Sequence, residues 1–165
     1  MKFIKLELII LFNAFSLCER ETLLKDIDSK TYIKRTLITA GVGVSCEVAF
    51  TSLYNFFETK ETHLMGHSYL WMIALYSLIY PTYRKVFPKV AHLHSLYRYS
   101  IYTSMIYSGE YFGGRLLRKF IGAAPWEKFY HDKAWAIDDL IRLDYAPVWF
   151  LAASIFEETC CVIDE

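Results

Sequence analysis

Charge is scarce in this sequence. Charged side chains make up 22% of its 165 residues, and the basic and acidic residues balance at 18 each. An average soluble domain carries about 25% charged residues. Proteins that bind nucleic acid need a basic surface, because contacts to the phosphate backbone supply much of their affinity. A chain with no net charge therefore gives no reason to expect a nucleic-acid partner.

The sequence also lacks the short motifs of several common active sites. It contains no phosphate-binding loop, dinucleotide fingerprint, zinc-protease motif or nucleophile elbow, so an ATPase role is not encoded. Its four cysteines have neither the spacing of metal ligands nor the regular ladder of a disulfide scaffold. The pairs His63 with His67 and His92 with His94 have no further ligands nearby, and we expect them at a membrane interface. No metal site and no cofactor are predicted.

Apolar residues are abundant, at 55% of the chain, and they are concentrated in four blocks over 37–57, 64–83, 96–117 and 145–163. Each block is about 20 residues long, the length that crosses a hydrocarbon core about 30 Å thick. The fold class predicted is an all-α polytopic membrane helix bundle of about four transmembrane helices, with no β-sheet. Tyrosine and tryptophan near the block ends are typical of an aromatic belt: Trp71, Tyr80, Tyr83, Tyr97, Trp126, Trp135 and Trp149.

The N-terminal part divides into two segments before the membrane domain. Residues 1–18 contain two lysines and a short apolar run, which indicate a signal peptide or an interfacial leader. The run is too short for a stable span, so we expect the leader to be removed or to lie apart from the four helices. Residues 19–34 are a polar linker, and 35–163 form a single four-helix membrane domain.

Basic residues give a partial orientation. The loop between the second and third blocks is flanked by Arg84, Lys85, Lys89 and Arg98. The positive-inside rule places this loop and the N-terminus in the cytoplasm. The loop after the third block is also basic, however, so the charge pattern does not fix the sidedness or name the membrane.

Charged residues fall inside the apolar blocks, among them Glu47, Glu110, Arg115, Glu157 and Glu158. A charge at the centre of a membrane costs about 2.5–3.5 kcal/mol on insertion scales, so such residues face the interior and find partners. We expect Glu47 to point inward, within reach of Glu110, Arg115 or Glu157. Three converging carboxylates would form an ion or proton site, or Arg115 would neutralise one of them. The alternatives are structural hydrogen bonds between helices and acid or base catalysis by a buried glutamate.

Small residues predict where helices pack closely. Gly109 and Gly113 form a G-x-x-x-G pair in the third block, and Gly41 begins a small-x-x-x-small pair in the first. Gly43 shares a helix face with Glu47. The segment 122–139, between the third and fourth blocks, is predicted to be an interfacial segment: an amphipathic helix, a re-entrant cap or an ordered loop.

Several segments together resemble a known family: residues 46–51, 68–76, Glu110, 116–126, and 143–150 followed by Glu157. Their order and spacing are similar to those of the transmembrane protein 229 family, whose bacterial relatives are labelled ABC-transporter type IV permeases. The resemblance covers about residues 35–163 and implies a multi-pass membrane protein with a glutamate in the first, third and fourth spans. The family tends to place proline directly before the last tryptophan, where this chain has Val148. A family glycine before that motif falls near Asp138 and Asp139.

The function expected is that of a multi-pass integral membrane protein, either a transporter-like subunit or a helix-bundle scaffold with intramembrane glutamates. Its partners would be the lipid bilayer and either a partner membrane subunit or a second copy of the chain. An intramembrane enzyme that uses a buried glutamate is the alternative. A cavity around the glutamates would favour transport, and tight packing would favour a scaffold.

Overall fold

The computed structural model describes residues 26–60 and 62–165, and the predicted leader over 1–18 lies outside the described residues. The described part is mostly helical, as predicted. The helices are α3 (Ser29–Thr59), α4 (Leu70–Tyr76), α5 (Ile79–Val90), α6 (Ser95–Ile121), α7 (Glu127–Tyr130), the 3-10 helix η1 (Leu143–Tyr145) and α8 (Ala146–Asp164). Two short strands, β1 (Ala136–Ile137) and β2 (Ile141–Arg142), lie between α7 and η1.

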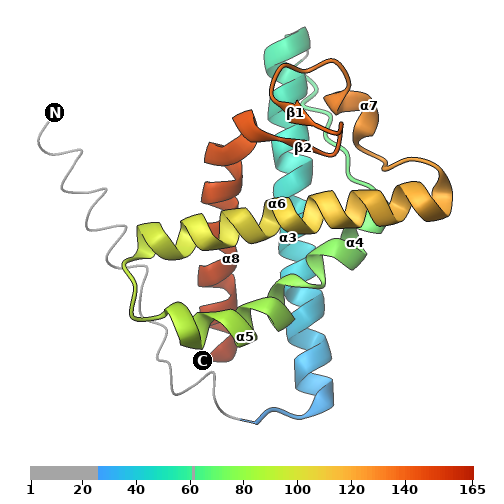
Figure 1. Cartoon of the computed structure of the whole chain (residues 1–165). Helices are drawn as coiled ribbons and strands as arrows, with labels where there is room; N and C mark the ends of the chain where they lie inside the picture. The colour runs from blue at the N-terminus through green and yellow to red at the C-terminus, as the bar shows by residue number, and fades with distance from the viewer. Residues whose placement is uncertain (1–25, 61) are drawn as a thin grey trace, which may run out of the picture.

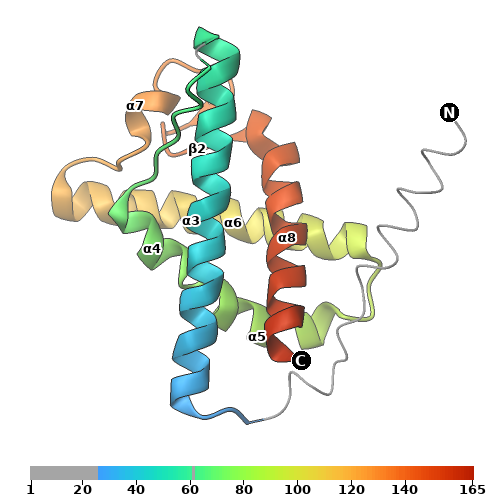
Figure 2. The same cartoon turned by 180° about the vertical axis from the view of Figure 1, so that it is seen from behind.

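The helices form two crossed layers (Figure 1). The long helices α3 and α8 lie side by side in one layer, and the view from behind shows them in front of the others (Figure 2). In the other layer α6 and the α4–α5 pair run across both long helices. Four parallel spans were expected, and this part of the prediction is wrong. Helices that cross in this way cannot all stand along one membrane normal.

Two helical segments are long and apolar enough to cross a membrane: Ser29–Thr59 and Leu143–Asp164. In their most apolar parts only 17% and 33% of the residues are buried inside the protein. A core helix of a soluble protein would bury most of such a stretch, because exposed apolar surface is unfavourable in water. Helix α6 is also long, but charged and polar side chains interrupt its apolar residues, and it is not among the candidate spans.

The second predicted span is broken into α4 and α5. Pro81 has no N–H to donate to the carbonyl of Ser77, so a continuous helix cannot pass this point intact. Helix α4 ends at Tyr76, and α5 begins at Ile79, which places Pro81 in the first turn of α5, where the missing donor does little harm. The apolar composition of 64–83 therefore predicted one long helix where the structure has two short ones.

Helix α3 begins inside the predicted polar linker. The Asp28 carboxylate accepts the backbone N–H groups of Lys30 at 2.9 Å and Thr31 at 3.1 Å, which caps the free donors of the first turn. Lys60, with a φ of 59°, ends the helix in the left-handed conformation.

The segment between α6 and α8 is an ordered cap that contains a small antiparallel sheet. The pairs Ala136↔Arg142 and Ile137↔Ile141 join β1 to β2, so the expected absence of β-structure is wrong. Asp138 and Asp139 both have positive φ, at 57° and 55°, as a type I′ turn requires. In the resembled family a glycine falls near this turn, and glycine adopts such angles without strain.

Aromatic residues fill the core more than they form a belt. Tyr80, Tyr83 and Trp126, which were expected near the headgroups, are 0%, 4% and 6% exposed. The indole N–H of Trp126 donates to the carbonyl of Leu140 at 2.9 Å, which satisfies its one polar group inside the cap. Tyr97 and Trp135 are exposed, so for these two residues the belt stays a prediction.

The four glycines predicted to pack helices differ in their surroundings. A Cβ on Gly43 would lie 2.5 Å from the Tyr76 ring, and one on Gly113 would lie 2.8 Å from Leu75, so both positions need a small residue. A Cβ on Gly41 or Gly109 would have nothing within 4 Å, so neither glycine lies at a helix contact. In the predicted pair of Gly109 and Gly113, only Gly113 therefore lies against a neighbouring helix, and Gly41 of the other pair does not.

Candidate functional site

Two cavities lie inside the protein, and they share one wall. The cap-side cavity, of about 260 Å³, is enclosed by α3, the segment 67–76 and the cap. The α5-side cavity, of about 220 Å³, lies between α4, α5, α6 and α8 and has almost entirely apolar walls. The side chains that line both cavities are Met72, Tyr76, Glu110 and Trp149.

Glu110 is the charged group in the shared wall. It lies on α6, is only 8% exposed, and its Oε2 atom has no hydrogen-bond partner within the described chain. The indole N–H of Trp149 lies nearby, and it also has no hydrogen-bond partner within the described chain. An unpaired polar atom in a buried position is costly, because it has lost its water and gained no replacement. This atom is therefore available to a proton, a cation or water.

Glu47 lines the cap-side cavity together with Glu110. Its Oε2 atom accepts the hydroxyl of Ser68 at 2.8 Å, and the Tyr76 hydroxyl lies toward the same carboxylate. No basic side chain forms a salt bridge with either glutamate among residues 26–60 and 62–165. Glu47 and Glu110 therefore form a pair of acidic groups without a positive partner in the described chain.

The polar stripe on α3 holds the neighbouring chain in place. The Thr51 hydroxyl donates to the carbonyl of His67 at 2.9 Å and accepts its N–H at 2.9 Å. The Asn55 amide donates to the carbonyl of Met65 at 3.0 Å, and Ser52 bonds to Leu64. These side chains satisfy the backbone of a segment that has no regular structure. They fix Ser68 and the wall of the cap-side cavity against α3.

Glu157 is not part of this acidic pair. It lines the α5-side cavity, and Arg98 on α6 holds it in a two-pronged ion pair, with Nε 2.9 Å from Oε2 and Nη2 2.5 Å from Oε1. Arg98 is 3% exposed and Glu157 is 2% exposed. The prediction that three glutamates converge is therefore wrong. Arg98 was counted among the basic residues that flank the loop, but it is buried in α6 and paired with Glu157, so it is no evidence for membrane sidedness.

Arg115 does not neutralise any of the predicted glutamates. Its side chain is exposed on α6, where Nη1 donates to the hydroxyl of Tyr111 at 3.2 Å and the guanidinium lies 5.8 Å from that ring. Arg115 follows Glu110 by five residues, which places it on a different face of the helix. Its role as an ion-site residue is therefore corrected to that of a surface side chain.

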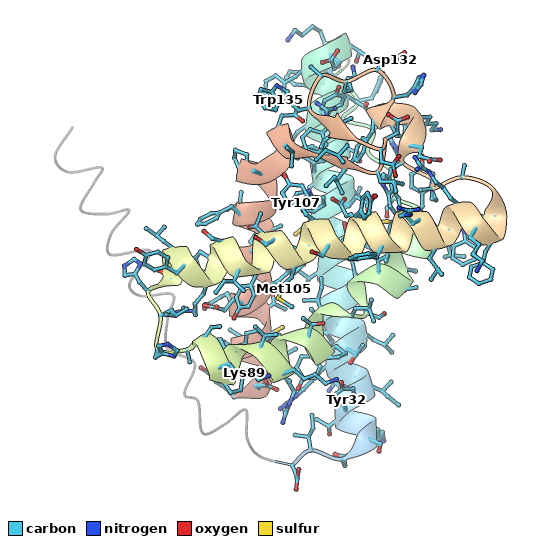
Figure 3. The ribbon with its side chains drawn as sticks, viewed as in Figure 1. Tyr32, Lys89, Met105, Tyr107, Asp132 and Trp135 are labelled. Carbon is cyan, nitrogen blue, oxygen red and sulfur yellow. The ribbon has the colours of Figure 1, made fainter. Side chains whose placement is uncertain are left out.

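The cap supplies the outer wall of the cap-side cavity. Tyr107 on α6 points toward the cap and donates to the carbonyl of Arg142 at 3.0 Å, whereas Met105 lies on the side of α5 (Figure 3). Burial raises the pKa of the Tyr130 phenol, which keeps it neutral in the wall. The exposed His131 lies 3.1 Å from Asp139, and its pKa is raised by the hydrogen bond with Asp139 and by the charges of Asp132 and Asp139.

Some site residues carried no clear signal in the sequence. Ser68 and Trp149 resemble ordinary small and aromatic residues of an apolar block, and Lys128 and Lys133 resemble interfacial charges. Among the residues that the structure describes, no group of three His, Cys, Asp or Glu side chains is arranged to hold a metal ion.

No protein-family model matches this chain, and no solved structure matches it. The resemblance to the transmembrane protein 229 family therefore stays a prediction from the sequence.

Proposed function

We propose that this chain is an integral membrane protein that exchanges protons or small cations through its interior, with Glu110 as the exchange group. Exposed apolar side chains on both candidate spans support the membrane location. Phe57 is 66% exposed on α3, and Leu151 and Val162 are 61% and 59% exposed on α8. Large exposed apolar surfaces of this kind are stabilised by lipid. The family resemblance favours the same location, and its permease label names no substrate.

The observation that carries the exchange role is the position of Glu110. Glu110 lies in the one wall that the two cavities share, and its buried Oε2 atom has no partner in the described chain, so a proton or cation bound to this carboxyl group would lie between the two cavities. Carboxyl groups inside membrane proteins commonly mark ion pathways and proton relays. Tight packing around the glutamates would have favoured a scaffold. The two cavities beside Glu110 argue against a scaffold role.

Glu157 plays a different part in this account. A carboxylate that is paired with Arg98 on both oxygens has no free atom for a transported ion. We therefore assign Glu157 to stability and Glu110 to exchange. The lipid bilayer is the partner that this function requires, and a partner membrane subunit or a second copy stays a prediction.

The test has a location arm and a transport arm. The full chain should stay in the membrane pellet after alkaline carbonate extraction, as integral proteins do. Purified protein in liposomes that contain a trapped pH-sensitive dye should dissipate an imposed pH gradient faster than protein-free liposomes. Release into the carbonate supernatant would contradict the location. Equal rates with and without protein would contradict the exchange role.

A further inference from the structure

The cap-side cavity has the wall composition of a site for an organic ammonium group. Its lining is rich in aromatic rings, including Tyr54, Tyr69, Tyr76, Tyr145 and Trp149. The faces of such rings attract cations, and the attraction is stronger where water is excluded. Glu47 and Glu110 add two carboxylates to the same walls. The α5-side cavity differs, because its walls are almost wholly apolar and Arg98 already neutralises its second glutamate.

The same cavity has two positively charged side chains at its outer side. Lys128 and Lys133 also line it, and both are exposed, whereas Glu110 is buried. The Lys128 ammonium lies 4.9 Å from the centre of the Phe129 ring. Neither lysine forms a salt bridge within the described residues. Both remain available to an anionic group at the mouth of the cavity.

We propose that the cap-side cavity binds a zwitterion, with its ammonium group at Glu47 and Glu110 and its anionic group at Lys128 and Lys133. A simple cation would meet the two lysines at the entrance, and a simple anion would meet the two carboxylates inside. A molecule with both charges complements both ends. Phosphocholine and phosphoethanolamine have this chemistry, either as free molecules or as lipid headgroups. A ligand site at Glu110 presupposes the interior exchange group proposed above and names the class of molecule that reaches it.

The unpaired Oε2 atom of Glu110 distinguishes this cavity from a chance cluster of acidic residues. Glu110 lines the cavity, and this atom of its carboxyl group is buried and has no partner in the described chain. An ammonium group placed there would supply the missing charge in a site from which water is largely excluded. The site is therefore incomplete without a positive group, as a binding site for a cationic moiety should be.

Isothermal titration of the full chain in an uncharged maltoside detergent tests this inference. The probes are phosphocholine, choline and inorganic phosphate. Phosphocholine should bind about tenfold more tightly than either of the other two, because only it engages both ends of the cavity. Similar affinities for phosphocholine and choline, or no binding of phosphocholine, would overturn the zwitterion assignment.

Variants of the exposed lysines keep the test independent of folding. Lys128→Gln with Lys133→Gln should lower the affinity for phosphocholine to about that for choline and should not weaken choline binding. Glu110→Gln should weaken phosphocholine and choline alike. Arg115→Gln, on the exposed face of α6, is the matched control and should change neither. Lysine variants that bind phosphocholine as wild type does would contradict the proposed orientation.

Two further measurements separate the sources of the ligand and the two proposals. A short-chain phosphatidylcholine below its micelle concentration should bind more tightly than phosphocholine if the occupant is a lipid headgroup, and no more tightly if it is a free molecule. Either result supports the shared chemistry. Protein-dependent proton flux without phosphocholine binding would overturn the zwitterion site and leave the exchange function standing. Phosphocholine binding without proton flux would overturn the exchange function and leave the zwitterion site standing.

Discussion

The pair of Arg98 and Glu157 illustrates what a buried charge requires. Each side chain is almost fully buried, and three hydrogen bonds join the pair between α6 and α8. Arg98 also donates to the carbonyl of Leu93 at 2.8 Å, which ties the start of α6 to the preceding turn. Removing one member of such a pair leaves an uncompensated charge in a site of low polarity.

We predict that Glu157→Gln lowers the free energy of unfolding in detergent by about 3–5 kcal/mol, because it leaves Arg98 buried without its counter-charge. The double variant Arg98→Met with Glu157→Met should recover much of this loss. Glu158→Gln, at the neighbouring and less buried position, should have a much smaller effect. Thermal unfolding followed by circular dichroism measures all three. A Glu157→Gln variant as stable as Glu158→Gln would show that the pair does not stabilise the fold.

The turn in the cap offers a second test at the scale of single residues. Asp139 has a φ of 55° and also contacts His131, so its replacement removes a surface contact and changes the backbone preference. Asp139→Gly and Asp139→Ala lose the same contact, and they differ only in the Cβ atom. We expect the glycine variant to be more stable than the alanine variant by about 1 kcal/mol. Chemical denaturation compares them, and equal stabilities would mean that the turn does not hold this conformation.

Sequence patterns located the buried charges better than their partners. An acidic residue inside an apolar block is visible in one sequence, and the structure buries both Glu110 and Glu157. The partner depends on the helix crossing, which no pattern in one chain reveals. Arg98 was therefore counted among the charges that flank a loop and Arg115 was expected in the interior, whereas the structure buries Arg98 and exposes Arg115.

At the scale of elements, α3 and α4 meet at a position where only glycine fits. A Cβ on Gly43 would overlap the Tyr76 ring, while a Cβ on Gly41 would meet nothing. We predict that Gly43→Ala destabilises the protein by about 1–3 kcal/mol through overpacking. Gly41→Ala should stabilise it by up to about 1 kcal/mol, because alanine favours the helix more than glycine does.

The two substitutions are chemically identical and lie in the same helix, so each controls for the other. Melting temperatures in one detergent should fall for Gly43→Ala and stay or rise for Gly41→Ala. If both variants move in the same direction, the close approach of α3 to Tyr76 is not a feature of the protein in solution.

The helices α3 and α8 lie where the sequence predicted them, because a long apolar block is a local feature of the sequence. The first and last apolar blocks became α3 and α8, the two candidate spans. The prediction of one continuous span over the second block was wrong, because the apolar composition of 64–83 was given more weight than the helix-breaking effect of Pro81. The cap was predicted as an interfacial segment, but its strands are only two residues long each, and so short a pairing leaves no periodic pattern to detect.

The whole molecule combines these features into two crossed layers with cavities between them. The layers leave many apolar side chains of α3 and α8 exposed, while the acidic pair lines the cap-side cavity. Such an arrangement suits a protein in which lipid covers the apolar outside and the acidic groups are shielded in the interior. Composition predicted the apolar outside, but the crossing of the layers comes from tertiary packing alone.

The proton flux of Glu110→Gln liposomes tests the central claim most directly. Glutamine keeps the shape of the side chain but cannot bind and release a proton, so the protein-dependent rate should fall to that of protein-free liposomes. Glu158→Gln, also on a partly buried glutamate, should keep the wild-type rate. Matched reconstitution and unchanged helical content of both variants would make the comparison valid. If Glu110→Gln carried protons as fast as wild type, Glu110 would not be the exchange group.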